Sequence, residues 1–307
     1  MTEAMHNDNL DKLTGIVKDA VGLLSRDETP ASGPAPPRDD SSAAALLSSV
    51  QRVDKVQFSE ECVFSQSSEI GEKFRELRTN IQTLSSLGKV ETFVFSSCHH
   101  HEGKTHTTIN TARFMAQHEG RKILLVDCDM RRPKVKDKID FDFKHGLEDV
   151  LSERCRLEDA LVHFERENLT VLPTLSGCSD ATELLESPLM DKVLQDVRAA
   201  FDHVFIDTSP VLSTTDPLVI GAKVDGVILT VQAGTTQRDT VEHAISLLRQ
   251  ANVRILGVVL TQMKNYLPKY LHRYHYFRDL YADYYRSDGD FEGKSRKTKK
   301  RRRSGRR

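Results

Sequence analysis

A strand-like segment in this chain runs through a glycine-containing loop directly into a helix-like segment. The run at 92–97 is followed by Glu102-Gly103-Lys104-Thr105 and then by a helix-like segment over 104–118. In this context the backbone N–H groups at the helix start face a phosphate, the lysine reaches its oxygens and the threonine hydroxyl serves Mg²⁺. The pattern predicts a phosphate-binding loop of the Walker A type.

The loop departs from the usual glycine-rich sequence. Cys98 stands where the first glycine is expected, and three histidines, 99–101, occupy positions where small residues are common. A bulky side chain costs free energy wherever the backbone needs a positive φ. The alternative is a chance Gly-Lys-Thr before a helix, because short motifs produce false positives.

Aspartates follow two further apolar runs. Asp127 and Asp129 lie at the end of the run at 122–127, and Asp207 ends the run at 203–207. One such residue alone is more often an ordinary strand-end or helix-capping aspartate. Because the carboxyl ends of parallel strands meet at one edge of a sheet, we expect all three carboxylates to converge on the phosphates.

The order of apolar runs and helical segments indicates the fold class. Runs that are apolar on both faces alternate with helix-like segments, which is typical of an α/β, doubly wound, mainly parallel sheet. With the loop, this predicts a P-loop NTPase of the deviant-Walker, partition-ATPase-like type. The predicted strands are 92–97, 122–127, 169–173, 203–208, 225–231 and 254–260, and the predicted helices include 70–84, 104–118, 188–200 and 236–251.

Composition shifts divide the chain into five segments. An amphipathic helix is expected within 1–28, a Pro/Ser-rich linker over 29–68, the P-loop domain over 69–263, a tyrosine-cluster tail over 264–286 and a basic disordered tail over 287–307. The N-terminal helix either docks on a partner or is only marginally stable.

The charge distribution and the cysteines indicate the cellular compartment of the protein and its possible contact with a membrane. Residues 294–307 hold ten Lys or Arg and no acid. Because the net charge of the whole chain is −1, residues 1–293 have a net charge of −1 − 10 = −11. Such a run is a solvated tail or a contact for anionic lipid; specific nucleic-acid binding is not expected. Five scattered cysteines and no apolar stretch of about 20 residues indicate a protein of the reducing cytosol that is soluble or peripheral.

The tyrosines are confined to one short segment. All seven lie within twenty positions near the C-terminus, although tyrosine is common in cores and strands. The cluster is either an aromatic patch for a partner or a set of phosphate acceptors. Its members are Tyr266, Tyr270, Tyr274, Tyr276, Tyr281, Tyr284 and Tyr285.

Together these features resemble the bacterial tyrosine kinases that autophosphorylate a C-terminal tyrosine cluster and control capsule or exopolysaccharide synthesis. The resemblance runs from about Glu72 to Tyr285. Besides the loop and the tail, it is carried by Glu72–Ile81, the Asp-x-Asp-x-Arg strand end at 127–131, Ala181–Leu185 and Phe201–Pro217. It implies ATP–Mg²⁺-dependent transfer to tyrosine on a P-loop fold.

The resemblance also assigns roles to residues. Asp127 is the candidate base that accepts the tyrosine proton, and Thr105, Asp129 and Asp207 are the candidate Mg²⁺ ligands. The catalytic set is Lys104, Asp127, Asp129 and Asp207. The expected nucleotide-binding residues are Glu102, Gly103, Lys104, Thr105, His106 and Arg131.

The helix at 70–84 is the expected contact between subunits. It carries Glu72, Arg75 and Arg78, which match a helix that joins subunits into a ring in the resembling family and places one tail at a neighbour's site. Weak surface ion pairs within the helix are the alternative. The resemblance further implies a membrane-embedded polysaccharide activator, a cognate tyrosine phosphatase, and a position on the inner face of the plasma membrane.

Two other functions stay open. A dimeric ATPase switch of the partition or septum-positioning type shares this sheet but carries a lysine early in the loop, where this chain has His99. A catalytically weak scaffold that acts by contact alone is the other.

Overall fold

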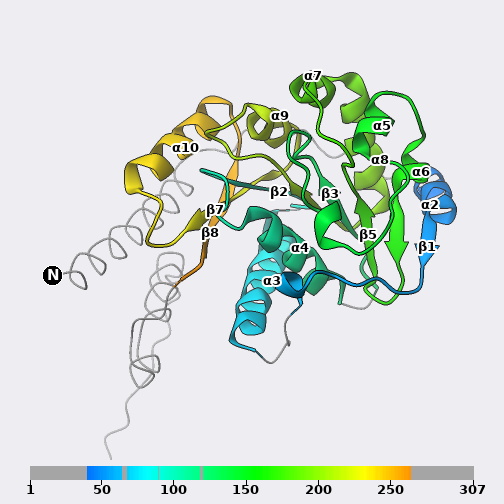
Figure 1. Cartoon of the computed structure of the whole chain (residues 1–307), viewed down its shortest axis with the longest axis horizontal. Helices are drawn as coiled ribbons and strands as arrows, with labels where there is room; N and C mark the ends of the chain where they lie inside the picture. The colour runs from blue at the N-terminus through cyan, green and yellow to red at the C-terminus, as the bar shows by residue number, and fades with distance from the viewer. Residues whose placement is uncertain (1–39, 64–67, 89, 118–119, 264–307) are drawn as a thin grey trace, which may run out of the picture. The chain divides into compact units, whose positions relative to one another are not determined.

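The fold centres on one mixed sheet, seen in a computed structural model that describes residues 40–63, 68–88, 90–117 and 120–263 (Figure 1). Eight strands pair in the order β1-β4-β5-β3-β6-β2-β7-β8 within these residues. The strands are β1 (Gln51–Val53), β2 (Thr92–Ser97), β3 (Ile123–Asp127), β4 (Val162–Phe164), β5 (Leu169–Leu172), β6 (His203–Asp207), β7 (Gly226–Gln232) and β8 (Ile255–Thr261).

The six predicted strands are all present, and the predicted doubly wound, mainly parallel sheet is confirmed. They are β2, β3, β5, β6, β7 and β8, and they pair in parallel with one another. Strands β2, β3 and β6 are buried at every position. This burial on both faces is why their sequences are apolar without alternation.

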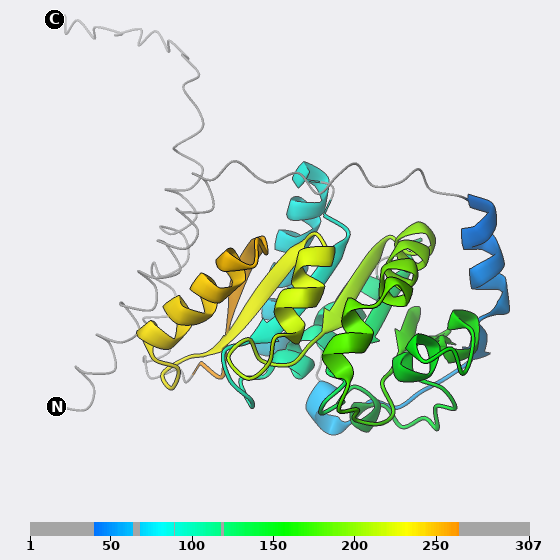
Figure 2. The same cartoon turned by 90° about the horizontal axis from the view of Figure 1, so that it is seen from above.

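Helices cover the two faces of the sheet in separate layers (Figure 2). On one face α4 packs on β2, β3 and β6, with α3 against it; on the other, α8, α9 and α10 pack on β6, β7 and β8. The longer helices are α2 (Asp40–Ser49), α3 (Glu69–Gly88), α4 (Lys104–Ala116), α8 (Pro188–Ala200), α9 (Asp216–Lys223) and α10 (Arg238–Gln250). Shorter ones are η1 (Glu60–Cys62), η2 (Lys136–Lys138), α5 (Leu147–Leu151), α6 (Leu157–Ala160) and α7 (Ala181–Glu186).

Side chains that alternate between the two faces of each strand form two separate hydrophobic clusters. Phe93, Phe95 and Phe205 pack under α3 and α4, with the rings of Phe93 and Phe205 stacked at 5.3 Å between centroids. Val94 and Ile206 point to the opposite side and join the cluster under α8, α9 and α10. Successive strand side chains point to opposite faces, so both helical layers are anchored by the same strands.

The predicted linker is wrong over residues 40–62, because these residues are part of the domain. Helix α2 packs on α8, and β1 pairs with β4 in register from Gln51–Val162 to Val53–Phe164. Val56, Phe58 and Cys62 are buried in the cluster under α3 and α4. The Ser/Ala-rich α2 and the three-residue β1 carry almost no periodic signal, and their order comes from the surface that they cover.

Several predicted segments lie outside the described residues. These are the N-terminal helix in 1–28, the linker residues up to 39, the tyrosine cluster and the basic run. Within the parts of the chain that the structure does describe, no helix combines the length and the apolar character needed to cross a bilayer.

The role of residues 40–62 is testable by truncation. A chain that begins at Glu69 should unfold roughly 10 °C or more below one that begins at Asp40, because each buried Val or Phe side chain that is removed contributes about 1.5–3 kcal/mol. It should also self-associate, because the edge of β4 loses its partner strand. Differential scanning calorimetry and sedimentation measure both effects, and equal melting temperatures would restore the linker assignment.

Candidate active site

The predicted phosphate-binding loop joins the end of β2 to the start of α4. Gly103 precedes α4 with φ of 86°, and His101 also lies in the left-handed region with φ of 67°. Only glycine adopts such angles without cost in conformational free energy. His101 is therefore the loop position at which the replacement of glycine destabilises the backbone conformation. The loop thus has the expected place, at the carboxyl edge of the sheet and the N-terminus of a helix.

Cys98, which replaces the usual first glycine, belongs to the core. It is fully buried in the cluster under α8, α9 and α10. Burial raises the pKa of its thiol to about 12, so the group stays neutral. A small neutral side chain therefore substitutes for glycine without placing charge near the loop.

Lys104 lies among carboxylates from two strand ends. Its Nζ is 2.8 Å from Asp129 Oδ2 and 3.5 Å from Asp207 Oδ2, and the lysine side chain is 10% exposed. Burial by itself would lower the pKa of Lys104, but the carboxylates of Asp207 and Asp129 outweigh it and raise the pKa. Lys104 is thus held as a cation at the convergence that the sequence predicts.

Thr105 and Asp207 form the second contact of this group. The Thr105 hydroxyl donates to Asp207 Oδ2 at 2.6 Å, and Thr108 donates to Oδ1 at 3.3 Å. Burial raises the pKa of Asp207, while Lys104 and these hydroxyls oppose the shift. The set of hydroxyl and carboxylate oxygens on Thr105, Asp129 and Asp207 suits a hard cation such as Mg²⁺.

Asp127 is fully buried and organises the turn after β3. Its carboxylate accepts backbone N–H groups from Asp129, Lys134 and Val135 at 2.9–3.0 Å. Burial and the neighbouring Asp207 nevertheless raise the pKa of Asp127 to about 8. The three N–H donors favour the ionised carboxylate, which is the form that a general base needs.

Arg131 binds a buried carboxylate that the sequence alone did not single out. Its Nε donates to Asp216 Oδ2 at 2.9 Å, and its terminal nitrogen donates to Thr182 at 2.8 Å. Thr182 in turn donates to Asp216 Oδ1 at 2.6 Å. The network joins the turn after β3 to α7 and α9. Both partners lie in segments that carry the family resemblance, which was the available signal.

Two expected nucleotide-binding residues make structural contacts. The Nε2 atom of His106 is 2.7 Å from the Glu61 carbonyl, and its ring packs near Phe74. The carboxylate of Glu102 is buried and accepts hydrogen bonds from the His99 N–H and the Thr236 hydroxyl. Both side chains therefore tie the loop or the helix start to neighbouring elements.

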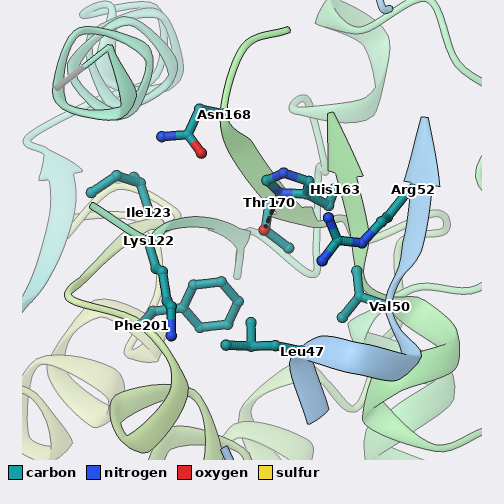
Figure 3. Close-up of a pocket in the computed structure, with 9 residues that line it drawn as sticks. All are labelled: Leu47, Val50, Arg52, Lys122, Ile123, His163, Asn168, Thr170 and Phe201. Atoms are coloured by element: carbon teal, nitrogen blue, oxygen red, sulfur yellow. Dashed lines mark hydrogen bonds between the residues drawn. The ribbon is translucent and has the colours of Figure 1, made fainter. Parts of the chain in front are cut away.

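A cavity lies at the other end of the strands (Figure 3). Its volume is about 190 Å³, and its lining includes Ile123 at the start of β3, with His163, Arg52 and Phe201. Asp127 ends the same strand, so the cavity and the Lys104 cluster occupy opposite edges of the sheet. The cavity is separate from the candidate active site.

On α3, the helix predicted to join subunits, charged surface residues pair with one another. Arg75 forms an ion pair with Glu72 one turn away, and both side chains are substantially exposed. Arg78 is half-buried on the same helix. This geometry fits a surface helix.

Comparisons with known proteins agree with this site. Residues 99–256, about half of the chain, match a family described as an AAA domain. The tyrosine-protein kinase YwqD of Bacillus subtilis is 31% identical over 193 residues, which are 63% of this chain and 81% of YwqD. The tyrosine-protein kinase CpsD of Streptococcus agalactiae is 30% identical over 207 residues, which are 67% of this chain and 89% of CpsD.

A solved structure gives the same assignment. The kinase domain of the Escherichia coli tyrosine kinase ETK superposes with a TM-score of 0.65 at 25% identity, covering 74% of this chain and 88% of that domain. The relatives are thus covered over most of their length, and the AAA-domain match at 99–256 includes Lys104 and both aspartate-bearing strand ends. On sequence, fold and site together, this chain belongs to the bacterial tyrosine kinases.

Proposed function

We propose that this chain is an ATP–Mg²⁺-dependent autokinase that phosphorylates its own C-terminal tyrosines in a neighbouring copy. The observation that carries the proposal is the buried cluster in which Lys104, Thr105, Asp129 and Asp207 meet at the phosphate-binding loop. The tyrosine segment of the sequence supplies the acceptors. We further propose that this reaction regulates polysaccharide synthesis or export, by analogy with the family.

The residues present fit the nucleotide and its metal. Lys104 and the amides at the start of α4 would bind the phosphates, and Thr105, Asp129 and Asp207 would hold Mg²⁺. Bound there, the metal supplies charge stabilisation for the transferred phosphoryl group. Phosphoryl transfer depends mainly on positioning and charge stabilisation, which is what a buried, hydrogen-bonded set of side chains provides.

Asp127 is proposed as the group that accepts the tyrosine proton. An unperturbed tyrosine has a pKa near ~10, so a base must be close to its hydroxyl in or after the transition state. Asp127 ends β3 and accepts the Asp129 N–H, so it lies at the same edge of the sheet as Lys104, which supports that role. Arg131 is proposed to position the turn that carries Asp127 and Asp129, since it joins the turn to Asp216.

The proposed partners follow from the family and the charge pattern. Helix α3 would join copies into a ring through Glu72, Arg75 and Arg78. A membrane-embedded activator would recruit the kinase to the inner face of the plasma membrane, and residues 294–307 would contact anionic lipid there. A cognate phosphatase would reverse the modification.

Lys104→Met should abolish tyrosine phosphorylation, because the methionine removes the charge that faces the phosphates. Phosphotyrosine is measured by intact mass and peptide fragmentation after incubation of purified protein with ATP–Mg²⁺. Lys192→Met is the matched control, since Lys192 is exposed on α8, and it should be fully active. Undiminished phosphorylation in Lys104→Met would contradict the kinase assignment, while ATP hydrolysis without phosphotyrosine in the wild-type chain would favour the ATPase switch.

Asp127→Asn should lower the phosphorylation rate by about 10²-fold or more while nucleotide still binds, because positioned bases contribute about 10²–10⁴ to such rates. Single-turnover phosphorylation and isothermal titration with ADP separate the two effects. Asp191→Asn, on the exposed start of α8, is the control. A rate within threefold of wild type would remove Asp127 as the base.

Mixing two inactive chains tests transfer between copies. A chain with all seven tyrosines changed to Phe should phosphorylate a Lys104→Met chain, because the first supplies an intact site and the second supplies the acceptors. Adding Arg75→Glu and Arg78→Glu to both chains should slow this transfer at least tenfold if α3 is the contact. Absence of phosphotyrosine in the mixture, beside normal autophosphorylation of wild type, would show that transfer occurs within one chain.

A further inference from the structure

The ends of β7 and β8 hold the phosphate-binding loop from outside. Gln262 Nε2 donates to the His101 carbonyl at 3.2 Å, and the Thr261 hydroxyl donates to the Glu102 carbonyl at 2.7 Å. Thr261 is the last residue of β8, and Gln262 follows it directly. Two consecutive carbonyls of the loop are therefore bound by residues about 160 positions later in the sequence.

A third side chain sets the direction of the Gln262 amide. Gln232, the last residue of β7, donates its Nε2 to Gln262 Oε1 at 2.8 Å. Because the amide oxygen accepts this bond, the amide nitrogen is the atom that faces the His101 carbonyl. The Gln232–Gln262 pair thus makes the contact with the loop directional.

The side chain of Glu102 fixes the loop at a second point. It is only 2% exposed, and its two oxygens accept from the His99 N–H at 2.9 Å and from the Thr236 hydroxyl. Thr236 lies between β7 and α10. The loop is consequently held at His99 by the Glu102 carboxylate, and at His101 and Glu102 by three residues that end or follow β7 and β8: Thr236, Thr261 and Gln262.

The loop needs such contacts because of its sequence. His101 has φ of 67° and Gln262 has φ of 52°, so a hydrogen bond joins two non-glycine residues that are both in the left-handed region. Residues with a Cβ adopt this conformation only where the surroundings impose it. A glycine at position 101 would need no such support.

We propose that Thr261 and Gln262 are positioning residues for nucleotide binding, which hold His101 and Glu102 in the conformation that presents the loop amides to phosphate. The inference rests on the proposed function, in which this loop binds ATP. It explains how a loop with three histidines remains preorganised. In the sequence, Gln262 lies two residues before Lys264, where the predicted tyrosine segment begins.

The test measures nucleotide affinity directly in the full chain. Isothermal titration with Mg²⁺ and a non-hydrolysable ATP analogue should give a Kd that rises about two- to tenfold in Thr261→Val and in Gln262→Ala, the effect of one lost hydrogen bond. Gln262→Glu keeps the size and the acceptor for Gln232 but turns an oxygen toward the His101 carbonyl, so its Kd should rise at least as much. Gln250→Ala is the control, because the amide of Gln250 donates to Ser246 on its own helix, and its Kd should equal that of wild type.

A double-mutant cycle identifies the cause. In a His101→Gly background, Gln262→Ala should change the Kd by less than about twofold, since glycine adopts the left-handed conformation unaided. Steady-state kinetics should show the same variants raising KM for ATP while kcat stays within twofold. Those results support the proposal.

Other outcomes overturn it, and they are distinguishable from failure of the kinase assignment. If Thr261→Val and Gln262→Ala lower the melting temperature but leave the Kd of the analogue unchanged, the contacts merely attach β8 to the loop. If the wild-type chain binds no analogue, the proposal and the proposed function both fail. If the variants weaken binding but the wild-type chain forms no phosphotyrosine, the positioning role stands and only the kinase assignment fails.

Discussion

The ion pairs of Lys104 with Asp129 and Asp207 bring the phosphate-binding loop and two strand ends together at one buried point. A lysine and three carboxylates within a buried edge of the sheet are unfavourable unless each charge faces an opposite one and the remaining oxygens accept hydrogen bonds. Thr105 and Thr108 satisfy Asp207, and backbone amides satisfy Asp127. These groups come from β3, β6 and α4, so forming the site requires that the centre of the fold be assembled first.

The surrounding structure holds this cluster with a second layer of polar contacts. Arg131 and Thr182 bind Asp216, which attaches the turn after β3 to α7 and α9. Glu102 and Thr261 attach the loop on the other side to the ends of β7 and β8. The site therefore lies between α7 and α9 on one side and the ends of β7 and β8 on the other. Hydrogen bonds to both sides restrain its side chains in the absence of substrate. Preorganisation of this kind is what lets positioning and charge perform phosphoryl transfer.

The fit of an unusual loop to an ordinary fold has a physical explanation. The Cys98 side chain is small, and its buried thiol is neutral. It can therefore occupy the loop position that glycine usually holds, although that position lies in the core. The histidines are placed where their rings reach solvent, with His99 and His101 exposed, and only the backbone of His101 is in a costly conformation. The departure from a glycine-rich sequence thus adds one conformational requirement, which hydrogen bonds from distant residues can meet.

Burial and parallel pairing leave a local apolar signal, so the six contiguous strands from β5 to β8 in the sheet were predictable from the sequence, as were the loop at Lys104 and the convergence of Asp127, Asp129 and Asp207. The remaining features depend on contacts between parts of the chain that are far apart in the sequence. Helix α2 packs on α8, and strand β1 pairs with β4. The hydrophobic residues of 40–53 show no helical or strand periodicity that would predict either element. The Asp216, Thr236 and Gln262 contacts join residues far apart in the chain, and such pairings follow from how strands are ordered in the sheet, which no local pattern encodes.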